Sequence, residues 1–218
     1  MILALDNIVV DIQASPILRG LSLQVDEGEL VGLVGRNGAG KTTTLRTIMG
    51  LTNPVSGTVK ILDRDVNAME AHKRPLLGIG YMPEDRRLVP QLTVEENILL
   101  PSWVNAEIDH QSGIRFVYEL MPELEAMKAR KSLLLSGGQQ KMVALGRALV
   151  AGTKLLVLDE PFEGVAPALA NRLSEVIAAL REQGRSILMA QSEFGHVVSL
   201  LDREYVVERG EIISEKST

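Results

Sequence analysis

The residues Gly35 to Thr42 read GRNGAGKT and match the pattern G-x-x-x-x-G-K-[ST] of a phosphate-binding loop. Glycines let backbone N–H groups approach phosphate oxygens closely, and the Lys41 ammonium supplies a positive charge for the β- and γ-phosphates. The Thr42 hydroxyl is suited to ligate Mg²⁺. This phosphate loop therefore predicts a site for nucleotide phosphates and Mg²⁺. A purely structural glycine-rich turn is the alternative interpretation.

Two adjacent carboxylates, Asp159 and Glu160, follow the apolar run from Leu155 to Leu158. Such a run is typical of a buried parallel strand, and the carboxyl end of a parallel strand lies on the ligand side of its sheet. We expect Asp159 to hold Mg²⁺ through water and Glu160 to orient and polarise an attacking water. An acidic pair after a strand is often only a solvated loop, so the phosphate loop upstream is what favours the catalytic interpretation.

A second glycine-rich stretch, Leu135 to Gln139, reads LSGGQ and precedes an expected helix. Its glycines expose backbone N–H groups at the helix N-terminus, and Ser136 adds a hydroxyl, so this signature segment is suited to contact an anion. One chain cannot easily direct both segments at one phosphate, whereas two chains packed head to tail can. The alternative is a Ser-Gly-Gly turn that only caps a helix.

The elements expected around the phosphate loop support the motif, because they place it between a strand and a helix. Leu30 to Val34 predict the strand, and Lys41 to Met49 predict the helix, which Gly50 ends. Alternating apolar residues within residues 1–30 predict further β-strands.

The remaining chain predicts helices first and an α/β pattern afterwards. Thr93 to Glu96 form a capping box that opens a helix, and residues 111–120 form another that ends near Pro122. After the acidic pair we expect a helix over residues 167–183, a strand over 186–190 and a hairpin around Arg209-Gly210.

Composition limits the function classes. The chain has 218 residues, which suits one domain, and its net charge of −5 gives no general attraction to nucleic acid. It has no cysteine, which excludes disulfides and cysteine zinc sites and suits a reducing cytosol. The N-terminus lacks the pattern of a secretory signal, and no apolar stretch reaches about 18 residues, so we expect no membrane-spanning helix.

The motifs GRNGAGKTT, LSGGQQ and LLVLDEP, in this order and spacing, resemble those of ABC transporter ATP-binding subunits over nearly the whole chain. The segments Pro83 to Ile98 and Glu163 to Pro167 are most similar to the branched-chain amino-acid importer group. The resemblance implies a P-loop NTPase (RecA-like) α/β core with an N-terminal antiparallel β region and a helical insert. It implies one domain over residues 1–218, with the core and β region in 1–87 and 146–218 and the helical sub-domain in 88–145.

The resemblance also implies a role for each motif residue, with Glu160 as the catalytic group and with ATP and Mg²⁺ as cofactors. The residues that would hold the phosphates and Mg²⁺ are Gly35, Arg36, Asn37, Gly38, Ala39, Gly40, Lys41, Thr42, Thr43, Glu84, Asp159 and Ser192. The residues that would contact the γ-phosphate bound by a partner chain are Ser136, Gly137, Gly138 and Gln139. The metal ligands would be Thr42, Glu84 and Asp159.

Four positions depart from the usual family pattern. Ile12 stands where an aromatic residue stacks on adenine, and Glu84 stands where a glutamine links Mg²⁺ to the membrane subunit. Ala166 stands in place of an aspartate, and Ser192 in place of a histidine that contacts the γ-phosphate. His196 is the alternative candidate for that contact. Because serine carries no charge, we expect slower hydrolysis supported by Glu160.

The resemblance implies an ATPase subunit that drives import of a small polar solute of the branched-chain amino-acid type. Its partners would be a second ATP-binding subunit, identical or homologous, integral membrane permease subunits and, indirectly, a substrate-binding protein, with no nucleic acid. The chain would lie peripherally on the cytoplasmic face of the inner (cell) membrane. The alternatives are the ATPase of an exporter or lipid transporter, and a nucleotide-gated module with weak hydrolysis. Repair and translation proteins of this family have long inserts or tandem domains, for which this chain is too short.

Overall fold

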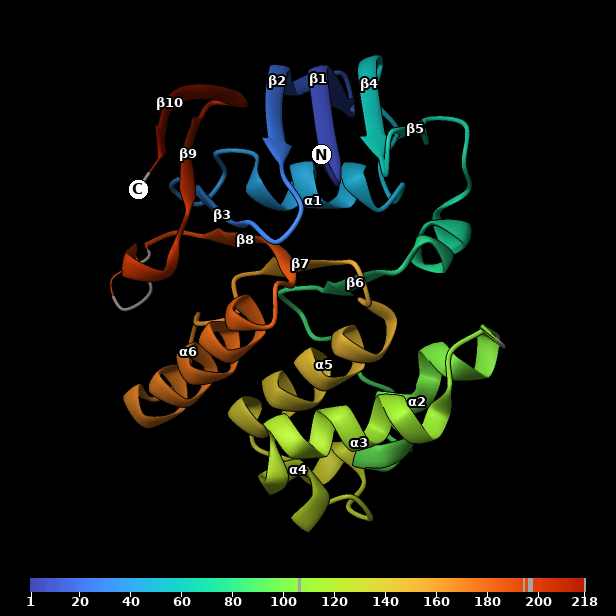
Figure 1. Cartoon of the computed structure of the whole chain (residues 1–218). Coiled ribbons are helices and arrows are strands. Elements are labelled where there is room, and N and C mark those ends of the chain that lie inside the picture. The colour runs from blue at the N-terminus through green and yellow to red at the C-terminus, as the bar shows by residue number, and fades with distance from the viewer. Residues whose placement is uncertain (106, 194, 196–197, 218) are drawn as a thin grey trace.

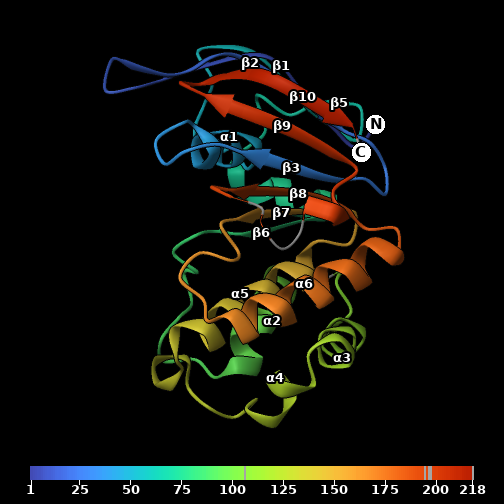
Figure 2. The same cartoon turned by 90° about the vertical axis from the view of Figure 1, so that its left-hand side faces the viewer.

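The computed structural model describes residues 1–105, 107–193, 195 and 198–217. Their helices and strands are arranged in layers (Figures 1 and 2). An antiparallel sheet lies at one end of the molecule and a mostly parallel sheet crosses the middle, with helix α1 (Lys41–Ile48) between the two sheets. The remaining α-helices cover the opposite face of the central sheet.

The central sheet is parallel except for one edge strand. In spatial order its strands are β10 (Glu211–Ser217), β9 (Arg203–Glu208), β3 (Leu30–Val34), β8 (Ser186–Gln191), β7 (Leu155–Asp159) and β6 (Ile79–Met82), and only β10 is antiparallel to its neighbour. The strands β3, β7 and β8 are apolar runs because both of their faces are covered. Their register pairs Val34 with Gln191 and Asp159 with Ala190, so the carboxyl ends of all three strands meet at one edge.

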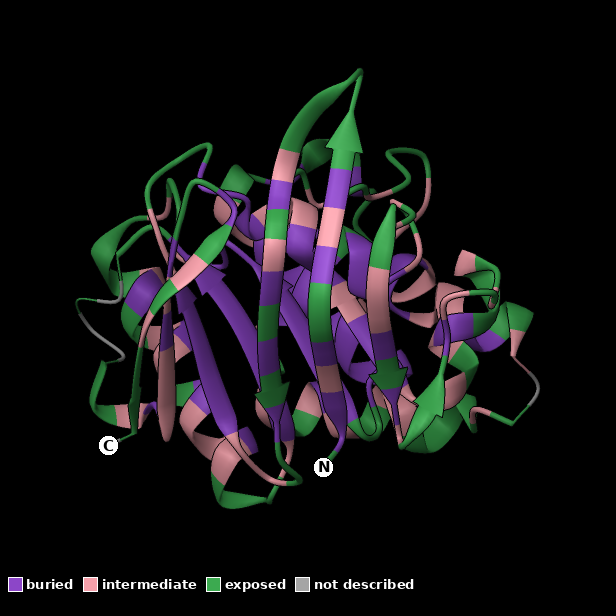
Figure 3. Cartoon of the chain, turned by 90° about the horizontal axis from the view of Figure 1, so that it is seen from above, coloured by how far each residue is buried: buried purple, intermediate pink, exposed green. Residues whose placement is uncertain are grey.

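The antiparallel sheet covers α1 on the side away from the central sheet. Its strands, in spatial order, are β2 (Ser15–Val25), β1 (Leu3–Ile12), β4 (Ser56–Ile61) and β5 (Arg64–Asp65). Along β2 the buried Leu21, Leu23 and Val25 alternate with exposed polar residues, because successive side chains of a strand point to opposite faces. Figure 3 shows buried positions interspersed with more exposed ones along both long strands.

The helical insert begins with the expected capping box, in which Thr93 and Glu96 bond each other's backbone N–H groups. Its α-helices are α2 (Val94–Val104), α3 (His110–Leu120), α4 (Pro122–Ala126) and α5 (Gly137–Ala151). Short 3₁₀ segments are η1 (Ala71–Leu77), η2 (Ser132–Leu134) and η3 (Val198–Leu200), and α6 (Pro167–Glu182) follows β7. Asp109 caps α3 by accepting from the N–H groups of Gln111 and Ser112.

Two hydrophobic cores lie on opposite faces of the central sheet. One joins that sheet to α1 and the antiparallel sheet, and the other joins it to α6 and the helical insert. Neighbouring strand residues contribute to different cores, as Leu30 and Val31 do. The elements that carry the phosphate loop, the acidic pair and the signature segment are therefore all anchored by buried side chains.

The predicted elements agree with the structure. The strand over residues 30–34 is found with those bounds, and the hairpin turns at Arg209 and Gly210, both of which have positive φ. The helix that the Thr93 capping box opens runs from Val94 to Val104, with Pro101 in its interior. The boundary proposed at residue 145 falls inside α5, which is continuous, so that end of the helical sub-domain remains a proposal.

Helix α1 ends on a buried arginine that sequence reasoning missed. The Arg74 guanidinium, 1% exposed, donates to the carbonyls of Thr47 and Ile48 at 2.7 Å each and to that of Val66 at 2.8 Å. A cation at a helix C-terminus satisfies the last carbonyls and complements the helix dipole. Gly50 allows this contact, because a Cβ there would lie 2.7 Å from Arg74 Nε.

We expect Arg74→Met to lower the free energy of unfolding by about 2–4 kcal/mol, because buried carbonyls lose their donor. Arg74→Lys is expected to recover only part of this, since an ammonium lacks the planar fork of a guanidinium. Urea unfolding followed by circular dichroism measures the effect, with Lys73→Met at the neighbouring exposed position as the control. Equal midpoints for Arg74→Met and Lys73→Met would contradict this account.

Candidate functional site

The phosphate loop connects the end of β3 to the start of α1 and encloses a cavity of about 430 Å³. Asn37, Gly38, Gly40, Lys41, Thr42 and Thr43 line it, together with Ile17, Glu84, Glu160 and Glu163. Gly35 has no room for a side chain, because a Cβ would lie 2.4 Å from the carbonyl oxygen of Val207. Gly40 precedes α1 with φ 115°, a conformation that favours glycine. The loop therefore directs backbone N–H groups and a helix N-terminus at the cavity.

Lys41 and Glu160 form a buried ion pair in this cavity. The Lys41 ammonium lies 3.0 Å from Glu160 Oε1, with both side chains about 95% buried, and it donates to the carbonyl of Gly35 over 2.6 Å. The predicted phosphate-binding lysine and the predicted catalytic carboxylate thus meet, although 118 residues separate them in sequence.

Asp159, the last residue of β7, is fully buried beside the phosphate loop. Its Oδ1 accepts a hydrogen bond of 3.2 Å from the Thr42 hydroxyl, while its Oδ2 is buried without a partner among the described residues. Burial raises the pKa of this carboxyl to about 6. A buried oxygen without a donor is costly unless a cation compensates it, so the carboxylate and hydroxyl oxygens here fit Mg²⁺.

The three predicted metal ligands lie around one hollow. Thr42, Glu84 and Asp159 all line a space of about 200 Å³, and Glu84 also lines the phosphate-loop cavity. Burial and the nearby carboxylates of Glu163 and Glu160 raise the pKa of Glu84. No cluster of three or more His, Cys, Asp or Glu residues suited to a metal ion occurs in the described part of the chain. Two carboxylates and a hydroxyl would thus hold Mg²⁺ together with nucleotide oxygens, which is how proteins commonly bind this ion.

Glu160 has a left-handed backbone conformation, with φ 48°, at the turn after β7. Its N–H donates to the carbonyl of Ala190 over 2.9 Å, which fixes the turn against β8. Its carboxylate is held on both oxygens by Ser192, since the hydroxyl lies 2.8 Å from Oε1 and the backbone N–H donates to Oε2 over 3.1 Å. The side chain therefore faces the phosphate-loop cavity with little rotational freedom.

Ser192 also contacts the phosphate loop itself. Its hydroxyl lies 2.8 Å from Asn37 Oδ1 and accepts from the Lys41 ammonium over 3.3 Å. The structure therefore places this residue between the loop and Glu160. The alternative candidate, His196, lies outside the described residues.

The signature segment lies apart from this cavity. Ser136 caps α5 by accepting from the N–H of Gln139 over 3.3 Å, and the Gln139 side chain accepts from Ser136 N–H over 3.0 Å. Ser136 and Gly137 are exposed, and none of the residues from Ser136 to Gln139 lines the phosphate-loop cavity. Gly138 lets α5 approach α6, because a Cβ there would lie 2.4 Å from Leu169 Cδ2. Within one chain the two glycine-rich segments do not meet.

Some predicted positions contribute no side chain to the cavity, and some contributors went unpredicted. Arg36 is exposed and Ile12 is 44% exposed at the β1–β2 hairpin, and neither lines the cavity. Ile17, further along the same hairpin, does line it. Glu163 adds a further carboxylate, which only its proximity to Glu160 in the sequence could have suggested.

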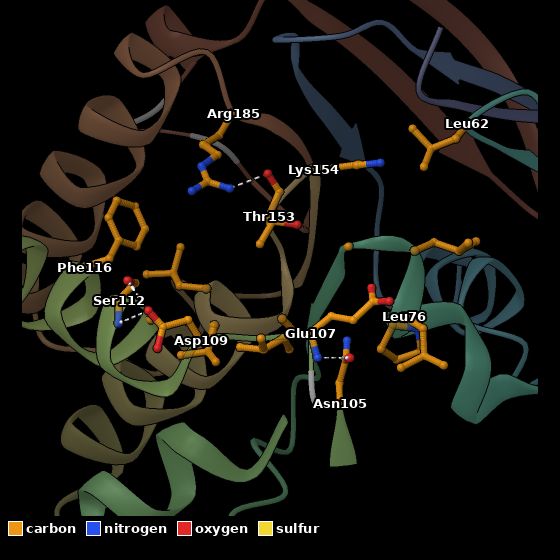
Figure 4. Close-up of a pocket in the computed structure, with 18 of the residues that line it drawn as sticks. Leu62, Leu76, Asn105, Glu107, Asp109, Ser112, Phe116, Thr153, Lys154 and Arg185 are labelled. Atoms are coloured by element: carbon orange, nitrogen blue, oxygen red, sulfur yellow. Dashed lines mark hydrogen bonds between the residues drawn. The ribbon is translucent and has the colours of Figure 1, made fainter. Parts of the chain in front are cut away.

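A separate cavity of about 590 Å³ lies between α3, the end of α5 and η1 (Figure 4). Arg185 lies over the Phe116 ring there, with its guanidinium carbon 5.2 Å from the ring centroid. The cavity contains no residue of the phosphate loop, so it does not belong to the predicted nucleotide site.

Known proteins resemble the chain over most of its length. The family described as ABC transporter matches residues 18–163. The branched-chain amino-acid transport ATP-binding protein BraG of Pseudomonas aeruginosa is 36% identical over 196 residues, covering 90% of this chain and 84% of that protein. The lipopolysaccharide export ATP-binding protein LptB of Haemophilus influenzae is 33% identical over 215 residues, covering 98% of this chain and 89% of that protein.

Solved structures agree with the fold. An ATP-binding cassette of an ABC transporter in its ADP conformation superposes with a TM-score of 0.87 and 29% identity, covering 100% of this chain and 91% of that chain. A dimeric bacterial ABC transporter cassette superposes with a TM-score of 0.87 at 24% identity, covering 99% and 98%. The predicted α/β P-loop fold with an antiparallel β region and helices is confirmed. The chain belongs to the ABC transporter family and is one of its ATP-binding domains, which are ATPases.

Proposed function

We propose that the chain is the ATP-binding and hydrolysing subunit that energises a membrane transporter. The observation that carries the proposal is the single cavity in which Lys41, Thr42 and Glu160 meet, beside an Asp159 oxygen that has no partner among the described residues. This set of groups suits a phosphate chain with its magnesium ion, because it combines a cation, backbone donors and hard oxygen ligands.

The residues divide the chemistry among them. Backbone N–H groups of the loop and the Lys41 ammonium would bind the β- and γ-phosphates, and Thr42, Asp159 and Glu84 would hold Mg²⁺, which would supply charge neutralisation on the phosphate oxygens. As Lys41 turns toward the phosphates, its hold on Glu160 weakens. The carboxylate then becomes available to accept a hydrogen bond from the attacking water and to orient it.

Ser192 acts mainly on Glu160 in this proposal. Its two hydrogen bonds to Glu160 keep the carboxylate directed at the cavity. Its hydroxyl also contacts Asn37 and Lys41, so Ser192 connects Glu160 to the phosphate loop. The residue thus aids positioning where the usual histidine would add charge. Slower hydrolysis than in histidine-containing relatives is the expected consequence.

The exposed signature segment supports a dimer in which each chain completes the other's site. Ser136, Gly137 and the N-terminus of α5 offer donors that nothing in their own chain's cavity uses. The occupant of this surface would be the nucleotide of a second copy or of a homologous subunit. ATP would close the pair, and hydrolysis would reopen it.

An apolar groove supports a membrane partner. It has a volume of about 610 Å³ and lies between the central sheet and the helical insert, with Leu51, Leu76, Leu100 and Val104 among its lining residues. Val104 is 83% exposed and Leu76 48%, so the groove offers contiguous apolar surface that a partner would cover. No described helix is long and apolar enough to cross a membrane. A cytoplasmic segment of a permease would fill the groove and hold the chain at the inner face of the membrane.

The transported solute is proposed from similarity alone, because no residue of this chain would contact it. Import of branched-chain amino acids, with a substrate-binding protein outside the membrane, is the leading candidate and rests on the similarity to BraG. Export of a lipid such as lipopolysaccharide is the second candidate and rests on the similarity to LptB. ATPase stimulation of the purified complex by leucine with its binding protein, or by lipopolysaccharide, separates the two.

Co-purification from detergent-solubilised membranes tests the transporter proposal. We expect the tagged chain to retain an integral membrane protein, and we expect Val104→Glu to abolish that retention because it places a charge in an apolar interface. Val55→Glu, at a 66% exposed valine outside the groove, is the matched control and is expected to behave like the wild type. Recovery of no integral membrane protein with the wild-type chain would refute the transporter role.

Glu160→Gln is expected to lower kcat of the assembled complex by at least about 100-fold, as loss of a general base typically does. ATP affinity is expected to remain within a few-fold, because the phosphate loop is intact. Phosphate release and nucleotide binding measure the two effects, and Glu182→Gln on the exposed side of α6 is the control. Unchanged hydrolysis in Glu160→Gln would show that another group activates the water.

Asp159→Asn is expected to stabilise the chain at pH 8 in the absence of metal and nucleotide, while abolishing hydrolysis. Burial raises the pKa from 3.8 to about 6, which corresponds to a cost of ~3 kcal/mol for the ionised group in the folded chain. This cost is present above pH 6, declines as the native carboxyl takes up its proton, and vanishes below about pH 4, where both states are protonated. Thermal unfolding against pH measures it, and a stabilisation that is equal at pH 4 and pH 8 would contradict the assignment.

A further inference from the structure

Lys141 is a buried lysine of α5 whose hydrogen bonds within the described part of the chain go to backbone oxygens. Its side chain is 6% exposed, and Nζ donates to the carbonyl of Glu160 over 2.7 Å and to the carbonyl of Glu163. None of the ion pairs between described residues involves Lys141. A buried ammonium is costly unless its donors are satisfied, so these two bonds define where the side chain must lie.

The two acceptors are the ends of one turn. The N–H of Glu163 donates to the carbonyl of Glu160 over 3.2 Å, so the carbonyl that closes the turn is the same one that Lys141 holds. The turn presents the Glu160 carboxylate to the phosphate-loop cavity from a backbone with φ 48°. A non-glycine residue persists in this conformation only where surrounding contacts hold it. Lys141 supplies such a contact from outside the central sheet.

The Lys141 ammonium lies close to the carboxylates of the cavity. Burial lowers the pKa of Lys141, and the Arg86 guanidinium acts in the same direction, whereas Glu163, Glu160 and Glu84, which line the cavity, favour the charged form. Phosphates entering this cavity would add further negative charge. A cation beneath the turn therefore stabilises the acidic wall of the site without reaching the phosphates itself.

Helix α5 connects Lys141 to the signature segment. Ser136 caps the helix, Lys141 lies five residues further along, and the loop that carries Glu84 is attached to the same helix. Arg86 Nη1 donates to the carbonyl of Gly137 over 3.3 Å and to Gln140 over 3.1 Å, while Arg147 donates to the carbonyls of Arg86 and Arg87. A shift of α5 is therefore communicated to both segments that bear carboxylates.

We propose that Lys141 is a positioning residue that fixes the Glu160 turn to α5, so that contact of the signature segment with the partner's nucleotide sets the catalytic carboxylate of the same chain. The proposal rests on the proposed ATPase function and dimer. It makes Lys141 the link between the two nucleotide sites. A merely structural lysine would support folding without linking them.

Steady-state hydrolysis by the assembled complex tests the link, with wild type, Lys141→Met, Lys141→Arg and the exposed control Lys128→Met compared at equal folded concentration. We expect Lys141→Met to lower kcat at least about 10-fold with KM for ATP changed less than about 3-fold, and to bring the Hill coefficient to 1. Lys141→Arg, which keeps the charge and the hydrogen-bond donors, is expected to keep most of the wild-type kcat and of the wild-type Hill coefficient. If Lys141→Met does not fold, Lys141→Gln replaces it with the same expectation.

The outcomes are distinguishable. Wild-type kcat and cooperativity in Lys141→Met, or equal losses in Lys141→Met and Lys141→Arg, would overturn the role of Lys141 and leave the ATPase function intact. If Lys141→Met lowers kcat but keeps the same Hill coefficient as the wild type, Lys141 only supports the turn. That result would overturn the proposed link between the two nucleotide sites. Absence of hydrolysis in the wild-type complex would instead refute the proposed function.

Discussion

Two neighbouring carboxylates at the end of β7 are buried, and their charge must be balanced within the site. The charge of Glu160 is balanced by the Lys41 ammonium at 3.0 Å. One oxygen of Asp159 accepts a hydrogen bond from the Thr42 hydroxyl, whereas the other has no partner among the described residues. The raised pKa of Asp159 expresses the cost of this arrangement. Such an arrangement persists where a ligand offsets its cost, and a nucleotide with its metal ion is the ligand that we propose here.

The sheet topology makes this concentration of charge possible. β3, β7 and β8 are adjacent and parallel, so the phosphate loop, the acidic pair and Ser192 leave the sheet at the same edge. Burial on both faces keeps their register, because a slip would misalign two hydrophobic cores at once. The helix dipole of α1 and the Arg74 guanidinium at its far end then stabilise the loop side of the site.

Helix α5 relates this site to the surfaces that face other molecules. Its N-terminus carries the signature segment, its side chains hold the Glu160 turn and the Glu84 loop, and its C-terminal part lines the apolar groove. One helix therefore carries the segment proposed to contact the partner's nucleotide, bonds the backbone of Glu160 and lines the proposed permease surface. This arrangement gives a physical route by which ATP binding and a membrane partner can affect each other.

Four features could be predicted from the sequence alone, because each depends on local residue types and spacing. They are the phosphate loop, the strand that leads to Asp159, the capping box at Thr93 and the hairpin at Arg209-Gly210. It also placed Ser192 and Glu84 beside the cavity by their distance from known motifs. Only the tertiary structure decided that Ser192 holds Glu160, that Ile17 rather than Ile12 lines the cavity, and that Arg74 and Lys141 bond distant backbone carbonyls. These contacts join residues from separate elements. Every residue has a backbone carbonyl, so the sequence does not indicate which carbonyl a distant side chain will bond.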